Sequence, residues 1–219
     1  MALLLYDSLA RKGIFDAQVV LNTYFDWFEH GAYDTGNTLY RTFTLMQQGL
    51  NHPLAVQMSY LESPSDGIAP AHRATPLALF LEGSALDDAL YQESKLTHHS
   101  EIAAQISIAS GRICAYLLKN IPLKEAVHMA ISDLDSELFP PYSNLGSCQP
   151  TGYAPHVLQA ALYFLSRYSS FNDALNAALY FAGPANYCPV LVGSLGGCMY
   201  PHIDSALLEH PQTPSRFFV

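Results

Sequence analysis

Apolar residues recur at steps of three and four along most of the chain, which is the spacing of amphipathic helices. The clearest stripe follows Asp16, which we expect to be an N-cap. Its apolar members are Val20, Leu21, Tyr24, Phe25 and Phe28. Similar stripes run through residues 102–117 and 157–165. Clean alternation of apolar and polar residues does not occur, so the pattern predicts helices and no sheet.

Short signals mark where helices start and stop. Ser84 with Asp87, and Ser170 with Asp173, match the S-x-x-D capping pattern ahead of apolar repeats. The connectors between stripes are rich in Pro and Gly and lie near residues 51–53, 63–70 and 140–152. The pattern predicts one all-α domain over residues 1–219, with about eight or nine helices.

Composition narrows the class of protein. Apolar residues make up 50% of the chain and charged residues 13%, so disorder is excluded. The formal net charge of -9 argues against nucleic acid or an anionic membrane surface as the partner. Residues 138–203 contain only Arg167 and Asp173 as charged side chains, but prolines divide this stretch below the length of a membrane span.

The cysteines and the first residues favour a cytoplasmic location. The four cysteines show neither C-x-x-C pairing nor the density of a disulfide scaffold, so we expect reduced thiols; they are Cys114, Cys148, Cys188 and Cys198. Met1–Tyr6 is apolar, but Asp7 interrupts it too early for a secretory signal.

Local patterns leave several polar residues open to two interpretations. Asp34 precedes another helical stripe and could be an N-cap or a functional carboxylate. His98 lies before the helix at Ile102 and could serve in capping or in a site. His98 and His99 do not share a helix face, and the chain has no H-x-x-x-H pair, so a zinc site is not expected. The glycines from Gly183 onward lack the strand and Lys-Ser/Thr of a phosphate loop.

Several segments taken together point to a family. In chain order they are Met1–Thr38, Pro70–Leu79, Leu96–His98, Thr151–Leu162 and Phe181–Gly197. In this order they resemble the ADP-ribosylglycohydrolase family, which includes the dinitrogenase-reductase-activating glycohydrolases. The resemblance implies a compact orthogonal bundle of helices with a cleft that holds two Mg²⁺ ions. It also implies hydrolysis of the glycosidic bond between ADP-ribose and an acceptor side chain, commonly arginine.

The resemblance also assigns candidate ligand-binding positions and exposes departures. By family position the candidates are Asp34, Arg73, His98, Gly183, Asn186 and Tyr187. The family's Gly-Asp-x-Asp-Thr metal loop is replaced by residues 183–187, where Pro184 has no ligand atom and Asn186 offers a neutral carbonyl. The family's first metal motif lies before the helix that here begins at Met1. We therefore expect no metal cofactor, assign no catalytic residue, and interpret the chain as truncated and degenerate at the magnesium site.

Three hypotheses follow from these departures. The first is an ADP-ribosylglycohydrolase-like pseudoenzyme, either a binding or regulatory module or a remnant, whose partner is ADP-ribose or an ADP-ribosylated protein. The second is an active hydrolase whose first metal motif comes from a longer or split gene product. The third is an immunity or regulatory partner of an ADP-ribosyltransferase. Missing helices would leave apolar stripes uncovered, so we also expect self-association.

Overall fold

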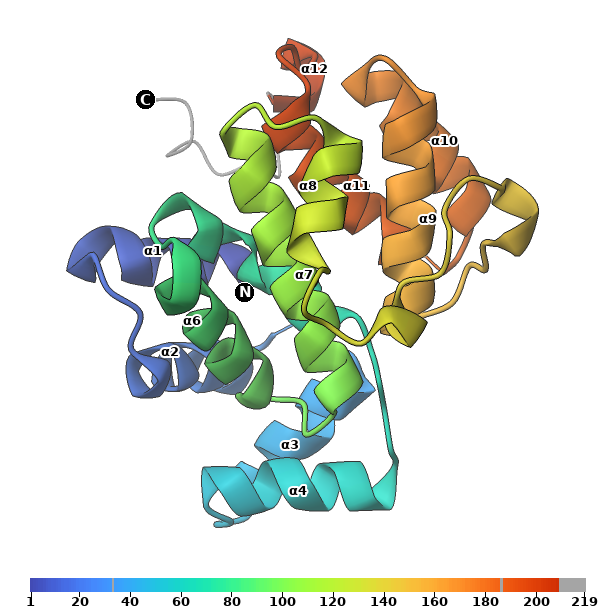
Figure 1. Ribbon diagram of the computed structural model, residues 1–219. Helices are drawn as coiled ribbons and strands as arrows, with labels where there is room; N and C mark the ends of the chain where they lie inside the picture. The colour runs from blue at the N-terminus through green and yellow to red at the C-terminus, as the bar shows by residue number, and fades with distance from the viewer. Residues whose placement is uncertain (33, 186, 209–219) are drawn as a thin grey trace.

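The computed structural model describes residues 1–32, 34–185 and 187–208, apart from the side chains of residues 206 and 208. Its α-helices run from α1 to α12 (Figure 1). Their bounds are α1 Ala2–Lys12, α2 Ala17–Glu29, α3 Asn37–Gln47, α4 His52–Glu62, α5 Ala69–Ala74, α6 Gly83–Lys95, α7 Glu101–Leu118, α8 Leu123–Ala130, α9 Ala154–Arg167, α10 Phe171–Ala182, α11 Tyr187–Met199 and α12 Ser205–Leu208. Three short 3-10 segments lie at Thr75–Leu79, Ser136–Leu138 and Leu145–Ser147.

The predicted all-α class is confirmed. Within the described ranges no strand forms, and the one isolated antiparallel bridge pairs Gly67 with Tyr153. There are more helices than the stripes predicted, because short helices such as α5 and α12 form where no long apolar repeat exists. In the described part of the chain no helix is long and apolar enough to cross a membrane.

The long helix α7 is the axis of the bundle. It packs against α5, α6, α8, α9 and α11, and Figure 1 shows it at the centre of the molecule. Gly111 lets α6 approach closely, because a Cβ atom there would lie 2.5 Å from the Cδ1 atom of Leu90. Ile106, Ile113 and Leu117 of the predicted stripe are all buried. The apolar repeat thus correctly identified the core helix.

The helix starts were predicted with mixed success. The Asp16 side chain accepts hydrogen bonds from the backbone N–H groups of Gln18 and Val19, both at 3.1 Å, which confirms the N-cap of α2. Ser170 accepts from the backbone N–H of Asp173 at 3.2 Å, which confirms the start of α10. A helix does begin near Ser84, but the capping role predicted for Ser84 was wrong: the N-cap of α6 is Glu82, two positions earlier, and Gly83 follows it with a φ of +57°.

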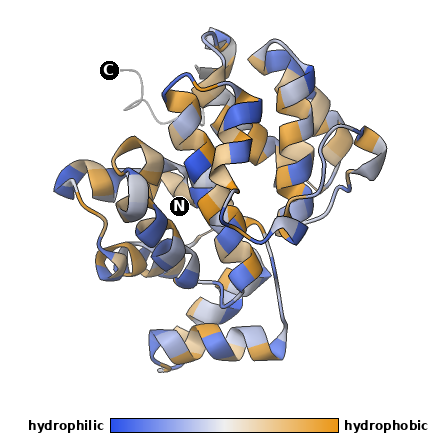
Figure 2. Ribbon diagram, viewed as in Figure 1, coloured by the Kyte–Doolittle hydropathy of each residue, from blue (hydrophilic) through white to orange (hydrophobic). Residues whose placement is uncertain are grey.

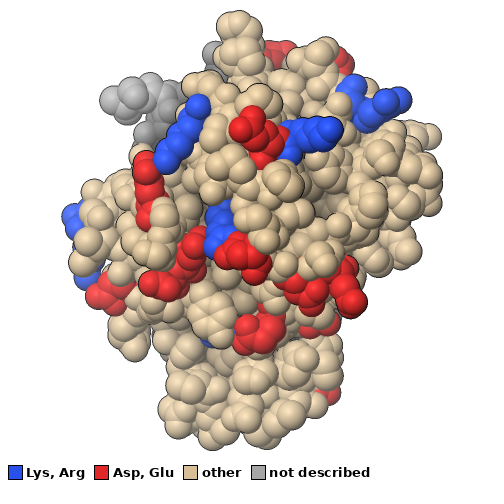
Figure 3. All heavy atoms as spheres, in the orientation of Figure 1, with Lys and Arg blue, Asp and Glu red and all other residues tan. Residues whose placement is uncertain are grey.

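The helices α3 and α4 form a hairpin at the lower end of Figure 1. Most helices carry both polar and apolar positions in Figure 2, as their stripes predict. On α4, however, Leu54, Met58 and Leu61 are exposed. Figure 3 shows few charged side chains over this end of the visible face. Self-association stays a prediction, for which these side chains offer an apolar surface.

Two connectors are held together beside the core. The backbone N–H of Ile68 donates to the carbonyl of Gly152 at 3.1 Å, and the N–H of Ala154 donates to the carbonyl of Asp66 at 2.9 Å. The loop before α5 is thereby fixed against the loop before α9. These two loops form part of the candidate site.

Candidate functional site

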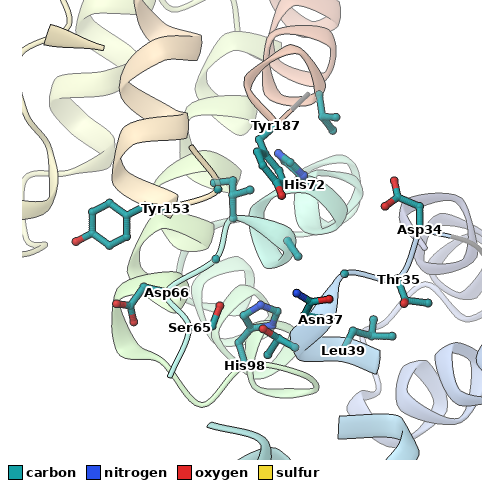
Figure 4. Close-up of a pocket in the computed structure, with 17 residues that line it drawn as sticks. Asp34, Thr35, Asn37, Leu39, Ser65, Asp66, His72, His98, Tyr153 and Tyr187 are labelled. Atoms are coloured by element: carbon teal, nitrogen blue, oxygen red, sulfur yellow. The ribbon is translucent and has the colours of Figure 1, made fainter. Parts of the chain in front are cut away.

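A cavity of about 520 Å³ lies where the N-terminal ends of α3, α9 and α11 meet the loop before α5 (Figure 4). This volume is in the range of small-molecule sites. The polar and aromatic residues that line it are Asp34, Thr35, Asn37, Thr38, Ser65, Asp66, His72, His98, Tyr153 and Tyr187. No lysine or arginine is among the lining residues that the structure describes.

Asp34 reaches the cavity from an unusual backbone conformation. Its φ is +51°, in the left-handed region that aspartate tolerates better than most residues, and Gly36 follows with a φ of +70°. Gly36, not Asp34, is the N-cap of α3, and no side chain caps that helix start. The N-cap interpretation of Asp34 was therefore wrong, because the N-cap position falls two residues later, at Gly36.

Two glycines allow the loops to approach the site closely. A Cβ atom at Gly67 would lie 3.3 Å from Ser65 Oγ and 3.6 Å from His98 Nε2. At Gly152, a Cβ atom would lie 3.3 Å from the ring of Tyr187. Larger side chains at these positions would push the loop walls away from the histidine and the tyrosine.

Ser100 links the start of α7 to the cavity wall. Its hydroxyl oxygen accepts from the backbone N–H of Ala103 at 3.1 Å, which confirms capping chemistry in this segment. The same hydroxyl donates to Asp66 Oδ1 at 2.6 Å. One oxygen of the Asp66 carboxylate is therefore already engaged by the protein.

The two histidines of the cavity are neutral at physiological pH. Burial, together with the nearby charges of Arg73 and Lys95, lowers the pKa of His98 to about 3. Burial also lowers the pKa of His72 to about 4, although the backbone of Tyr187 acts in the opposite direction. The Nε2 atom of His72 is buried and has no hydrogen-bond partner among the described residues.

Arg73 lies behind the cavity wall and does not line it. Only 4% of its surface is exposed, and its Nε atom donates to Glu93 Oε1. Its Nη2 atom donates to Thr97 Oγ1 at 2.7 Å and to the Glu93 carbonyl at 3.2 Å. The hydroxyl of Tyr24 donates to Glu93 Oε1 at 2.9 Å. The ligand-binding role predicted for Arg73 would therefore have to act through residues that it contacts.

Comparison with known proteins decides the family. The family model for ADP-ribosylglycohydrolase matches residues 1–210. The chain belongs to the ADP-ribosylglycohydrolase family. It is 25% identical, over 218 residues, to a protein of Pseudomonas putida (strain GB-1) named ADP-ribosylarginine hydrolase Tri1, and the match covers 91% of this chain and 57% of that relative. The chain thus spans just over half the length of this relative.

A solved structure supports the fold of this ADP-ribosylglycohydrolase family member. The structure, titled "ADP-ribosylglycohydrolase-related protein complex", superimposes with a TM-score of 0.74 at 23% sequence identity. The match covers 91% of this chain and 69% of that chain. At this identity the likeness establishes the fold alone.

The described residues of this family member do not fit two magnesium ions. Mg²⁺ requires near-octahedral coordination by oxygen atoms, usually with carboxylates. Asp34 and Asp66 are the only carboxylates among the described lining residues, and Figure 4 shows them on opposite sides of the cavity. No group of three or more His, Cys, Asp or Glu side chains in the described ranges could hold a metal.

The structure brings together three of the predicted site residues of this ADP-ribosylglycohydrolase family member, Asp34, His98 and Tyr187. Gly183 is the C-cap of α10 and is not among the lining residues. Asn186 lies outside the described residues.

Glu93 was not singled out from the sequence. This carboxylate lies in register with Leu86, Ala89 and Leu90 on the buried face of α6. A charged residue on a buried helix face indicates a charged partner in the core, so the pattern could have predicted the pair with Arg73.

Proposed function

We propose that this chain binds an ADP-ribosyl group in the cavity between α3, α9 and α11. Family membership supports this proposal. The described lining has no lysine or arginine, so the diphosphate would be held by neutral donors. The start of α3 has no side-chain cap, so backbone N–H groups there are available. At the start of α9 the N–H of Ala154 already donates to the Asp66 carbonyl and Pro155 has no N–H, so α3 is the main source of such groups. Such groups, at the positive end of a helix dipole, suit a diphosphate.

The aromatic rim suits the base of the same ligand. Tyr153 is 36% exposed and Tyr187 is 41% exposed, and both border the cavity. Half-exposed tyrosine rings offer apolar faces for stacking and hydroxyl groups for hydrogen bonds. In this arrangement the tyrosine rings would contact the adenine, and the backbone N–H groups at the helix start would bind the diphosphate.

We further propose that the chain does not catalyse magnesium-dependent hydrolysis. The support is the donor set: Asp66 shares one oxygen with Ser100, and Asp34 faces it from across the cavity. His72 and His98 are hydrogen-bonding groups without charge at neutral pH. We also propose a cytoplasmic location, which the four free cysteines support.

A second candidate function is removal of ADP-ribose from arginine side chains. The similarity to a protein named ADP-ribosylarginine hydrolase favours it, and a polypeptide longer than these 219 residues could supply further carboxylates. The role as a regulatory partner of an ADP-ribosyltransferase stays a prediction.

Calorimetric titration of the chain with ADP-ribose, with magnesium and with a chelator, tests the proposal. We expect saturable binding that is equal in both conditions. Tyr187→Leu should weaken binding by about tenfold through loss of a stacking face. Tyr180→Leu is the matched control, because Tyr180 is 93% exposed and does not line the cavity.

Two results would contradict the proposal in different ways. Absence of any heat at millimolar ADP-ribose would refute binding. Release of ADP-ribose from an arginine-modified protein, stopped by the chelator, would refute the lack of turnover and favour the second candidate.

A further inference from the structure

The side chain of Thr97 connects the buried Arg73 to the cavity histidine. Thr97 is fully buried, and its Oγ1 atom has two hydrogen-bonding neighbours. These are Arg73 Nη2 at 2.7 Å and His98 Nδ1 at 2.8 Å. A guanidinium group can only donate, so the Thr97 oxygen accepts from Arg73. The hydroxyl proton of Thr97 remains to be placed.

The imidazole nitrogen is the acceptor that completes this arrangement. If Nδ1 of His98 carried a proton, it would donate to Thr97, and the hydroxyl proton would have no acceptor among the described residues. A buried donor without a partner costs about 1–3 kcal/mol. The favoured arrangement therefore runs from Arg73 through the Thr97 hydroxyl to an unprotonated Nδ1, and the neutral ring carries its proton on Nε2.

The Nε2 atom faces the loop wall of the cavity. It lies 3.6 Å from where a Cβ atom at Gly67 would be, and His98 is one of the lining residues. Figure 4 shows the ring of His98 beside Ser65 and Asn37. The absence of a side chain at Gly67 leaves room for a ligand atom to approach this nitrogen.

We infer that Arg73 and Thr97 are positioning residues that fix His98 as an Nε2–H hydrogen-bond donor toward the ligand. The inference rests on the proposed function and adds which chemistry His98 recognises: an acceptor oxygen, of a phosphate or a sugar, bound without a cationic partner. Nε2 in this form has no lone pair to accept a proton, so His98 does not act as a general base through it.

Glu93 and Tyr24 fix the orientation of Arg73, the first residue of this hydrogen-bonded series. Glu93 Oε1 accepts from both Arg73 Nε and the Tyr24 hydroxyl. The Arg73 guanidinium also lies 5.6 Å from the centre of the Tyr24 ring. These contacts leave Arg73 one orientation, with Nη2 directed at Thr97.

Nitrogen-15 NMR of the full chain labelled at histidine tests the inference. We expect His98 to show an unprotonated Nδ1 and a protonated Nε2 at neutral pH, with the signal assigned by its loss in His98→Gln. Thr97→Val keeps the shape of the side chain but removes the hydroxyl. It should release the tautomer preference and weaken ADP-ribose binding about tenfold, the value of one hydrogen bond.

Thr97→Ser is the matched control, because serine keeps the hydroxyl and should restore both the tautomer and the affinity. A wild-type His98 protonated on Nδ1, or an unchanged tautomer in Thr97→Val, would overturn the inference. The NMR result is independent of ligand. An Nε2–H tautomer without any ADP-ribose binding would refute the proposed function and leave the Arg73–Thr97–His98 arrangement standing, but it would overturn the assignment of a ligand to His98.

Discussion

Two arginines of this protein bind carboxylates in opposite surroundings. Arg73 and Glu93 are 4% and 0% exposed, and Arg73 Nη1 and Glu93 Oε2 lack partners among the described residues. Arg112 is 16% exposed and pairs through two hydrogen bonds of 2.8 Å with Asp87. It also donates to Asp133, which is 62% exposed, and to the carbonyl of Ala130.

The difference teaches what each pair contributes. The Arg112 cluster joins α6, α7 and the end of α8 at the surface, where water reduces both the cost and the strength of the charges. The pair between Arg73 and Glu93 is desolvated, so its attraction must offset a large penalty. A buried pair with unsatisfied atoms is poor evidence for stabilisation. Its value lies in the orientation that it gives to Thr97 and His98.

The largest effect is expected from breaking the buried pair. Glu93→Ala should lower the free energy of unfolding by about 3–5 kcal/mol, because Arg73 would keep an uncompensated charge in the core. Urea denaturation measures this loss. The double variant Arg73→Met with Glu93→Leu should recover most of it, since no charge remains buried. A loss under about 1 kcal/mol in the single variant would show that the pair is not desolvated.

The next largest effect is expected from acid, which should lower the free energy of unfolding through the buried cavity histidines but not through exposed ones. The pKa values of His72 and His98 are lowered to about 4 and about 3 by burial, whereas an unfolded histidine titrates near 6.5. Their contribution is therefore complete above pH 6.5 and is lost as pH falls toward those lowered values. Between pH 7.5 and 5 we expect His98 to account for about 2 kcal/mol of lost unfolding free energy.

The control for this experiment is an exposed histidine. In His30→Gln the fall between pH 7.5 and 5 should be at most slightly larger than in wild type, because hydrogen bonding to Asp26 raises the pKa of this histidine but the side chain is 75% exposed. In His98→Gln the fall between these pH values should be smaller. Equal pH dependence in His98→Gln and wild type would contradict the burial of a neutral imidazole.

A smaller effect is expected at Arg112. Arg112→Ala removes bonds to Asp87, Asp133 and the Ala130 carbonyl, and we expect a loss of about 1–2 kcal/mol that decreases in high salt. Thermal unfolding at two salt concentrations measures it. Lys119→Ala is the control, because Lys119 and its partner Glu82 are 51% and 74% exposed and should contribute almost nothing. A salt-independent loss would count against the contrast between the two arginines.

The smallest effect is expected at Asp133. Its hydrogen bonds to Arg112 lower its pKa, so its contribution is present above its ordinary pKa of 3.8 and is lost as pH falls below that value. Asp133→Asn should cost less than about 1 kcal/mol at pH 7 and nothing at pH 2, as judged by urea denaturation. A cost that persists at pH 2 would show that the amide disturbs packing instead.

The sequence was sufficient where local chemistry decides the structure. The stripe of α7 and the caps at Asp16 and Ser170 depend on residues within a few positions of each other. The cavity depends on contacts between distant segments, so only the family resemblance could place Asp34, His98 and Tyr187 together. Neither periodicity nor resemblance indicated that Arg73 would turn from the cavity to Glu93, because that choice depends on how α5 packs against α6.

The bridge between Gly67 and Tyr153 has a consequence for how such a protein can diverge. Two backbone hydrogen bonds join the loop before α5 to the loop before α9, although the two loops lie far apart in the sequence. Inserting a residue into either connector at this point would break the pairing and shift both walls at once. Changes of ligand preference should therefore arise by exchanging side chains around a rim of constant length, while longer insertions should be tolerated only away from this bridge.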